Sequence, residues 1–91
     1  MEDVLWYVLA STRGGPTRAR ILRAIGDRPR NANDLAETLG YDYTTIRHHL
    51  DVLEENAIVE SIGEDYAVAY TPTDRCEAHW DVVCEIAEEL D

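Results

Sequence analysis

The feature that most constrains this chain is a three-residue connector, Gly40-Tyr41-Asp42, between two short segments with helical periodicity. Both segments place apolar side chains on one face, at Leu35, Ala36 and Leu39 before the connector and at Ile46, Leu50 and Leu53 after it. Spacings of three and four residues are typical of an amphipathic helix. Glycine suits the left-handed residue that ends many helices, and aspartate suits an N-cap. Two helices joined by so short a connector must cross, which predicts helix-turn-helix geometry.

A further helix is predicted before this pair, so that a three-helix core spans residues 16–56. Pro16 suits the first turn of that helix, because proline is already constrained to a helical backbone angle. Asn31 and Asp34 form a capping-box-like pair at the start of the next helix. Upstream, an apolar run within residues 1–11 predicts a short helix that is buried on several sides.

A β-hairpin is predicted over residues 58–71. Two runs rich in Ile, Val and Tyr, Ile58–Ile62 and Tyr66–Thr71, are separated by the three residues Gly63-Glu64-Asp65. Such runs around a short glycine-containing loop are typical of a hairpin. Pro72 is expected to end the second strand, because proline has no amide hydrogen to donate.

The last helix is predicted to run without interruption over residues 73–90, with Thr73 as its cap. Its apolar line consists of Cys76, Trp80, Val83, Ala87 and Leu90, and the first helix offers Leu5, Trp6 and Leu9. Because a small winged core is not expected to cover both stripes, we predict that they form the interface of a symmetric homodimer. The alternative is that the two terminal helices dock on each other within one chain.

The charge of the chain is strongly negative and unevenly distributed. The net charge is −11, all eight basic residues are arginines, and six of them lie in residues 13–30 against the single Asp27. Carboxylates in this number without any lysine resemble the composition of proteins from extremely salt-loving microbes, in whose molar salt charge repulsion is screened within about 3 Å. No apolar run approaches the roughly 20 residues of a membrane helix, and two cysteines do not make a disulfide framework. We therefore expect an acidic, halophilic, cytoplasmic protein.

The run Asn31–Val59, NANDLAETLGYDYTTIRHHLDVLEENAIV, resembles the winged helix-turn-helix of ArsR-like transcription regulators. Its most specific part is Asp42–Leu53, and the flanks LWYVLASTRGGPTRARIL and AHWDVVCEI resemble those of a haloarchaeal subgroup. The resemblance implies a mainly α fold with a small β wing (α+β), as one winged helix-turn-helix domain over residues 1–91. Such proteins commonly carry glycine where this chain has Ala57, so Asn56 is expected to supply the left-handed turn.

The third core helix, about residues 43–55, carries side chains that suit the major groove of DNA. Those predicted to point outwards are Tyr43, Thr44, Arg47, His48 and Asp51. Arginine can bind guanine through two hydrogen bonds, and threonine can contact a thymine methyl or a phosphate. Asp51 is expected to pair with Arg47 one helical turn away, and His49 is expected to be partly buried. The alternative interpretation is an ordinary solvated helix face.

Contacts to DNA phosphates are expected from the flanking arginines, chiefly Arg13, Arg18 and Arg30, because guanidinium groups pair with phosphates through two bonds. The alternative is that these arginines pair with the chain's own carboxylates. The acidic hairpin tip is poorly suited to gripping phosphate.

Metal and cofactor sites are not expected. Cys76, His79 and Cys84 lie on one predicted helix but point in different directions, so one chain cannot aim all three at a single ion. Both cysteines are expected to be ordinary small apolar residues, with an interchain metal or disulfide as the alternative. The sequence contains neither a phosphate-binding glycine loop nor a nucleophile–base pair, and we do not expect an enzyme.

These observations predict a homodimeric, sequence-specific regulator of transcription that binds double-stranded DNA and places its recognition helix in the major groove. The competing hypothesis is an acidic winged-helix module that docks a protein partner and does not bind DNA directly. The sequence does not indicate a small-molecule effector.

Overall fold

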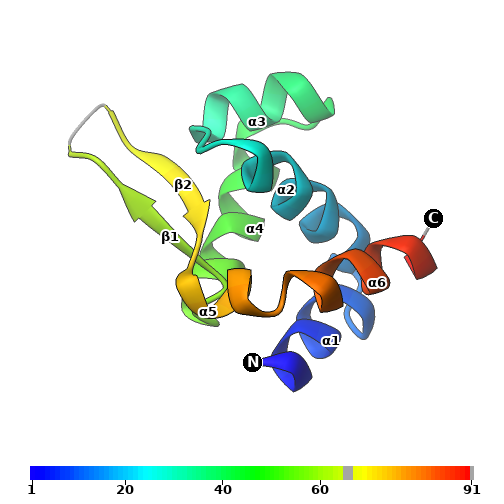
Figure 1. The fold of residues 1–91 in the computed structure, drawn as a ribbon. Helices are drawn as coiled ribbons and strands as arrows, with labels where there is room; N and C mark the ends of the chain where they lie inside the picture. Colours follow the sequence, from blue (N-terminus) through cyan, green and yellow to red (C-terminus); the bar gives the residue numbers. More distant parts are fainter. Residues whose placement is uncertain (65–66, 91) are drawn as a thin grey trace.

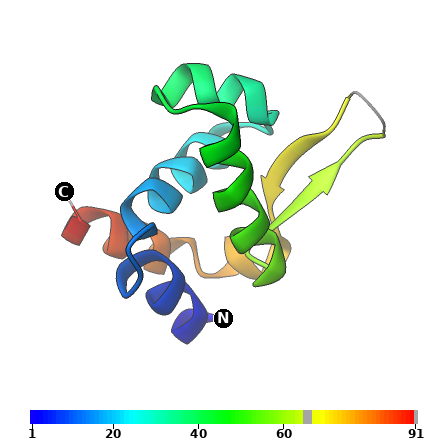
Figure 2. The same cartoon turned by 180° about the vertical axis from the view of Figure 1, so that it is seen from behind.

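The computed structural model describes residues 1–64 and 67–90 and is mainly helical with one small sheet, as predicted (Figure 1). The elements, in chain order, are α1 (Glu2–Ala10), α2 (Gly15–Asp27), α3 (Ala32–Leu39), α4 (Tyr43–Glu55), β1 (Val59–Ile62), β2 (Ala69–Pro72), α5 (Asp74–Ala78) and α6 (Trp80–Leu90). Seen from behind, α4 runs from α3 towards the base of the β-hairpin (Figure 2). This placement lets one helix contact both the preceding helix and the wing.

The predicted caps of the helix-turn-helix are confirmed. The side-chain oxygen of Asn31 accepts a hydrogen bond from the amide of Asp34 at 2.7 Å, and that of Asp42 accepts one from the amide of Thr45 at 2.7 Å. Gly40 has a φ of 78°, and its amide donates to the carbonyl of Ala36. These contacts end α3 and begin α4 within three residues, which forces the two helices to cross.

The hairpin is shorter in its strands and longer in its loop than the sequence predicts. β1 and β2 are antiparallel, with Ile62 opposite Ala69 as the last pair and Val59 opposite Pro72 as the first. Pro72 is thus the final residue of β2, and it does not stop the strand beforehand. The connection spans residues 63–68, of which Asp65 and Tyr66 lie outside the described residues.

The C-terminal helix is interrupted, which corrects the prediction of one continuous helix over residues 73–90. Thr73 caps α5 as expected, accepting a hydrogen bond from the amide of Cys76 at 3.2 Å. The helix breaks at His79, whose amide bonds to the carbonyl of Cys76 at 3.0 Å and whose backbone has a φ of −115°. The break has a packing reason. α5 contacts β2 while α6 contacts α1 and α2, and one straight helix would not reach both surfaces.

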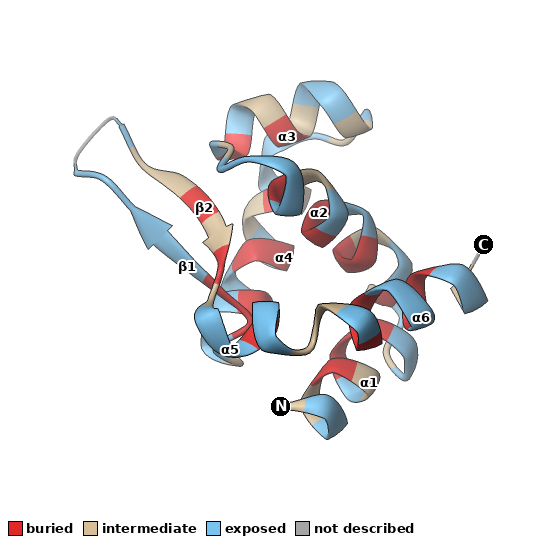
Figure 3. Cartoon of the chain, viewed as in Figure 1, coloured by how far each residue is buried: buried red, intermediate tan, exposed pale blue. Residues whose placement is uncertain are grey.

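The first and last helices, α1 and α6, pack on each other within one chain. This arrangement is the alternative to a homodimer formed through the apolar stripes of both helices. Five of the eight residues predicted at a dimer interface are buried within the single chain, and red segments mark buried positions on both α1 and α6 (Figure 3). They are Leu5, Leu9, Cys76, Val83 and Ala87. The prediction is therefore wrong for these five. The helix α6 turns back after the break and packs on α1, and Cys76 is buried in α5, which packs on β2. Trp6, Trp80 and Leu90 remain partly exposed.

The turn from α4 into the wing is made by Ala57, which has a φ of 58°. Asn56, expected to adopt this left-handed conformation, instead has a φ of −95°, and its side chain donates to the carbonyl of Val52 at 2.8 Å. A left-handed backbone brings the alanine Cβ close to its own carbonyl oxygen, a strain that glycine does not have.

We therefore predict that Ala57→Gly raises the free energy of unfolding by about 0.5–1 kcal/mol, because relief of strain exceeds the entropy that glycine adds to the unfolded chain. Urea unfolding followed by circular dichroism in molar KCl measures the change. The matched control is Ala24→Gly inside α2, which should lower the free energy of unfolding by about 1 kcal/mol. A loss of stability in Ala57→Gly comparable to that of the control would contradict the prediction.

Candidate nucleic-acid interface

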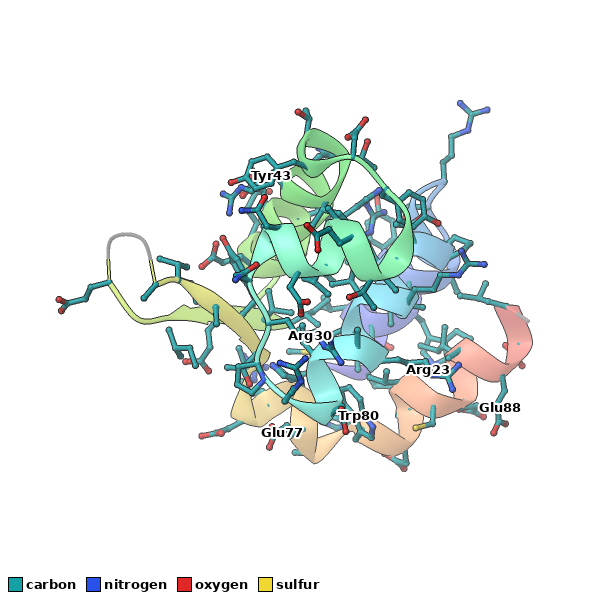
Figure 4. All side chains as sticks on the ribbon, turned by 90° about the horizontal axis from the view of Figure 1, so that it is seen from above. Arg23, Arg30, Tyr43, Glu77, Trp80 and Glu88 are labelled. Atoms are coloured by element: carbon teal, nitrogen blue, oxygen red, sulfur yellow. The ribbon has the colours of Figure 1, made fainter. Side chains whose placement is uncertain are left out.

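The outward face of α4 is exposed as predicted, because its opposite face is fixed in the core. Ile46, Leu50 and Leu53 are fully buried. Tyr43 is 50% exposed at the start of the helix, and the side chains of Thr44 and His48 are also exposed. In the view from above, Tyr43 lies on the side of the molecule away from Trp80 (Figure 4). The start of α4 is thus open to a large ligand.

The guanidinium group of Arg47 has two hydrogen-bond partners within the protein, although the residue lies on this exposed face. One guanidinium nitrogen, Nη1, donates to the hydroxyl of Tyr70 in β2, and Nη2 pairs with Asp51 at 3.1 Å. The ion pair predicted from the four-residue spacing is therefore present. The guanidinium carbon also lies 5.7 Å from the centre of the Tyr70 ring, within the range of a cation–π contact. Arg47 thus joins the exposed face of α4 to the wing.

A hollow of about 270 Å³ opens beside Arg47, between the start of α3, the start of α4 and β2. Its lining combines amide, hydroxyl and guanidinium groups with two small apolar side chains. The lining residues are Asn31, Ala32, Asn33, Tyr43, Arg47, Val68 and Tyr70. Such a lining offers hydrogen-bond donors and acceptors, and so suits a polar ligand better than an apolar one.

A second arginine–tyrosine contact lies on the α2 side, at the connector before α4. Arg20 donates to the hydroxyl of Tyr41 at 3.0 Å, and Thr17 donates to the same oxygen at 3.4 Å. The bond from Thr17 and the nearby charge of Arg20 lower the pKa of Tyr41. Sequence reasoning missed both Arg20 and Tyr41 as candidates. Arg20 belongs to the positive segment 13–30, but only the fold shows that it reaches the connector.

The predicted phosphate contact at Arg18 is wrong, because its side chain is only 5% exposed. Nε donates to the carbonyl of Val8 at 3.2 Å, Nη2 donates to the hydroxyl of Thr12, and Nη1 lies 3.1 Å from Nδ1 of His49. Arg18 therefore joins the end of α1, α2 and α4 inside the fold. A buried guanidinium needs such partners, since an unpaired buried charge is strongly unfavourable.

Arg30 is also turned inwards, with its side chain 14% exposed, so that the alternative of internal pairing holds for it. Nε donates to the carbonyl of Ala24 at 2.9 Å, and Nη1 pairs with Asp34 at 3.1 Å. Arg13 is exposed and is the one residue of the three predicted phosphate contacts that faces solvent.

His49 is buried in α4, more deeply than the partial burial expected, and its ring contacts Arg18. Burial, the adjacent guanidinium of Arg18 and the neighbouring His48 all lower the pKa of His49. The neutral ring accepts the Arg18 hydrogen bond at Nδ1, and so carries its own proton at Nε2. Protonation would place two cations in contact inside the fold.

The two cysteines differ in their surroundings. Cys76 is fully buried, and burial together with Glu77 raises the pKa of its thiol to about 11, whereas Cys84 is exposed. Over residues 1–64 and 67–90, no three His, Cys, Asp or Glu side chains gather into a group that could hold a metal ion. Within the same residues, the structure contains no helix with the length and hydropathy needed to cross a membrane.

Comparison with known proteins identifies this arrangement. Residues 15–62 match a family described as a helix-turn-helix domain. Among curated proteins none matches the chain. Among solved structures the chain is similar to the homodimeric winged helix-turn-helix DNA-binding domain of Mb0332 from Mycobacterium bovis, a possible ArsR-family transcriptional regulator. The two are 21% identical with a TM-score of 0.73, and the match covers 96% of this chain and 77% of that one.

Two further solved structures share the fold. An ArsR-like transcriptional regulator from Rhodococcus sp. RHA1 is 24% identical with a TM-score of 0.68, covering 98% of this chain and 78% of that one. A mutant of ZitR from Lactococcus lactis is 18% identical with a TM-score of 0.67, covering 80% of this chain and 52% of that one. This chain thus matches about half the length of ZitR. At these identities the likeness establishes the winged helix-turn-helix fold alone.

The Arg18–His49 contact predicts a pH dependence of stability. In the unfolded chain His49 has an ordinary pKa of about 6.5, and its folded pKa is lower. Below about pH 6.5 the unfolded state therefore binds more protons than the folded state, so stability is complete above this pH and falls as the pH falls. The loss approaches at most about 1.4 kcal/mol per pH unit, the limit for one proton.

Urea unfolding at pH 7.5 and 5.5 tests this prediction by comparing the wild-type chain with His49→Gln, whose amide oxygen can still accept from Arg18. The variant should lose less stability on acidification than the wild type. His48→Gln, at the exposed neighbouring position, is the matched control: it removes only the smallest of the three causes that lower the pKa of His49 and should keep most of the wild-type loss. Equal losses in the wild type and His49→Gln would show that His49 is not the responsible group.

Proposed function

Because this chain belongs to the helix-turn-helix domain family, we propose that it is a sequence-specific regulator of transcription that binds double-stranded DNA as a homodimer, with α4 in the major groove. The observation that carries the proposal is the exposed start of α4, where Tyr43, Thr44, Arg47 and His48 share one accessible face. Arginine and threonine there can form hydrogen bonds and apolar contacts with base edges. We further propose that the chain is an ArsR-like regulator of the haloarchaeal subgroup.

The distribution of charge supports this orientation on DNA. The exposed Arg13 and the Arg20–Tyr41 contact lie on the α2 side of the helix-turn-helix and offer positive charge to the phosphate backbone. Carboxylates gather on the C-terminal helices, where Glu77 and Glu88 lie away from Tyr43 (Figure 4). A duplex bound at α4 would therefore meet the less acidic side of the molecule.

The acidic surface also indicates the solvent in which the protein works. We propose that it acts in a cytoplasm of high salt, where the net charge of −11 is screened within about 3 Å. High salt also removes most of the affinity that comes from counterion release. Direct contacts between α4 and the bases would then supply a larger share of the binding free energy.

The homodimer is supported by apolar side chains that the terminal helices leave uncovered. Tyr7 is 64% exposed, and Trp6, Trp80 and Leu90 are partly exposed. The structurally similar domain of Mb0332 is homodimeric. To contact two half-sites separated by one turn of DNA, a two-fold pair must place its two copies of α4 about 34–36 Å apart.

A protein-interaction module with an acidic surface is the second candidate function. The inward orientation of Arg18 and Arg30 favours it, because two positive charges are withdrawn from the surface. The carboxylates of Asp42, Asp51 and Glu54 then lie close to the exposed face of α4. Selection of duplexes by the wild-type protein separates the two candidates, since a module that docks proteins would enrich no DNA sequence.

The proposed DNA binding predicts that Arg47→Ala reduces discrimination between sequences. Wild-type protein first selects duplexes from a random-sequence library in molar KCl, and mobility shift then compares the selected duplex with a scrambled one. Loss of one bidentate base contact should weaken specific binding by about tenfold or more. The matched control, Arg75→Ala, removes an exposed arginine from α5 and leaves α4 unchanged, so it should keep wild-type discrimination. Unchanged discrimination in Arg47→Ala would exclude the proposed recognition role of Arg47.

The proposed homodimer predicts that Tyr7→Glu converts the protein to a monomer, because a charge replaces an exposed aromatic side chain at the interface. Sedimentation equilibrium in molar KCl should give twice the chain mass of 10.3 kDa for the wild type and the single mass for the variant. Ile62→Glu is the matched control, since Ile62 is an exposed apolar residue on the wing, and this variant should remain dimeric. A monomeric wild-type protein would refute the dimer.

A further inference from the structure

Tyr70 lies in β2 between β1 on one side and the segment that connects α2 and α3 on the other. On one side it lies opposite Ser61 in the antiparallel pair with β1. On the other side its amide donates to the carbonyl of Arg30 at 2.8 Å and its carbonyl accepts from the amide of Arg30 at 3.2 Å. The residue is 4% exposed. Its backbone is therefore held by the wing and by the segment between α2 and α3 at once.

The side chain of this fixed residue reaches Arg47 on α4. Its hydroxyl accepts a hydrogen bond from Nη1, and its ring lies beneath the guanidinium group. Asp51 holds Nη2 from the same helix. A free arginine side chain has many rotamers and loses that freedom when it binds a ligand. Arg47 has already lost much of it in the unbound protein, because two anchors on different elements act on one guanidinium group.

The anchored guanidinium keeps enough donors to bind a base. Arginine has five N–H donors, of which Tyr70 and Asp51 each take one, so that three remain. Guanine offers two acceptors in the major groove, O6 and N7. The hollow of about 270 Å³ beside Arg47 provides open space next to the group. The two anchors are therefore compatible with a bidentate contact.

We propose that Tyr70 is a positioning residue that orients Arg47 for base recognition, so that the wing contributes to sequence discrimination through α4 without touching the base itself. This inference rests on the proposed function of Arg47 in DNA binding. The side chain of Glu64 at the wing tip is exposed and acidic, which makes direct contact between this part of the wing and phosphate unfavourable. The base of the wing, by contrast, contacts the arginine directly. Pre-organisation of a binding group lowers the entropy lost on binding.

The first measurement needs no DNA. Side-chain ¹⁵N relaxation of the arginine Nε–H groups compares Arg47 with the exposed Arg13 in the wild-type protein. The order parameter of Arg47 should be clearly higher than that of Arg13 and should fall towards it in Tyr70→Phe, which keeps the ring and removes the hydroxyl. A wild-type Arg47 as mobile as Arg13 would overturn the proposal.

The second measurement is the ratio of affinities for the selected and the scrambled duplex in molar KCl. In Tyr70→Phe this ratio should fall about fivefold to tenfold, the size expected for loss of one restraining hydrogen bond, while affinity for the scrambled duplex stays unchanged. The matched control, Thr71→Val, removes a hydroxyl from the next residue of β2, whose side chain lies on the opposite face of the sheet, and should keep the wild-type ratio.

The outcomes separate this inference from the proposed function. If Arg47→Ala loses discrimination but Tyr70→Phe keeps both the wild-type ratio and the wild-type mobility of Arg47, the positioning role is wrong and the DNA-binding role stands. If Arg47→Ala keeps discrimination, the proposed recognition by Arg47 fails and the inference fails with it. Equal weakening of binding to both duplexes in Tyr70→Phe would indicate a general structural role and would also overturn the proposal.

Discussion

The burial of one face of α4 is the constraint on which the rest of the structure depends. Ile46, Leu50 and Leu53 are fully enclosed, and a helix fixed on one side has no freedom to rotate about its axis. The opposite face therefore points to solvent, and the order of residues in the sequence decides which side chains it carries. Rotation of α4 by one residue would bring Arg47 into the core and expose an apolar side chain, at a large loss of hydrophobic free energy.

Several arginines of this chain form hydrogen bonds inside the fold and are not simply charged surface residues. In a chain without lysine, Arg18 and Arg30 act as multiple hydrogen-bond donors that join neighbouring elements, with the carbonyls of Val8 and Ala24 among their acceptors. The planar guanidinium group can satisfy several acceptors at once, which an ammonium group on a flexible stem does less well. Arg47 combines both uses, because it is anchored within the protein and still faces open space.

Local features were predictable from the sequence, and features set by tertiary contacts were not. The caps at Asn31 and Asp42 and the exposed start of α4 follow from residue types within one or two turns, and they were predicted correctly. The orientation of Arg18 depends on His49, which is 31 residues away, so no local pattern indicates it. The helix break at His79 likewise arises from two different packing surfaces. The same reason explains why the stripes of the terminal helices were assigned to a partner rather than to each other.

The short passage from α4 to β1 has a consequence for how the chain can vary in length. Only residues 56–58 separate the helix from the strand, with the left-handed Ala57 at their centre. This connection is too short to absorb an extra residue. One inserted residue adds up to about 3.8 Å of chain, more than a hydrogen bond tolerates, and would shift the register that brings the Tyr70 hydroxyl to α4. Insertions beyond the last strand pair, Ile62 with Ala69, leave that register intact. Indels should therefore be tolerated at the far end of the hairpin and excluded at its base.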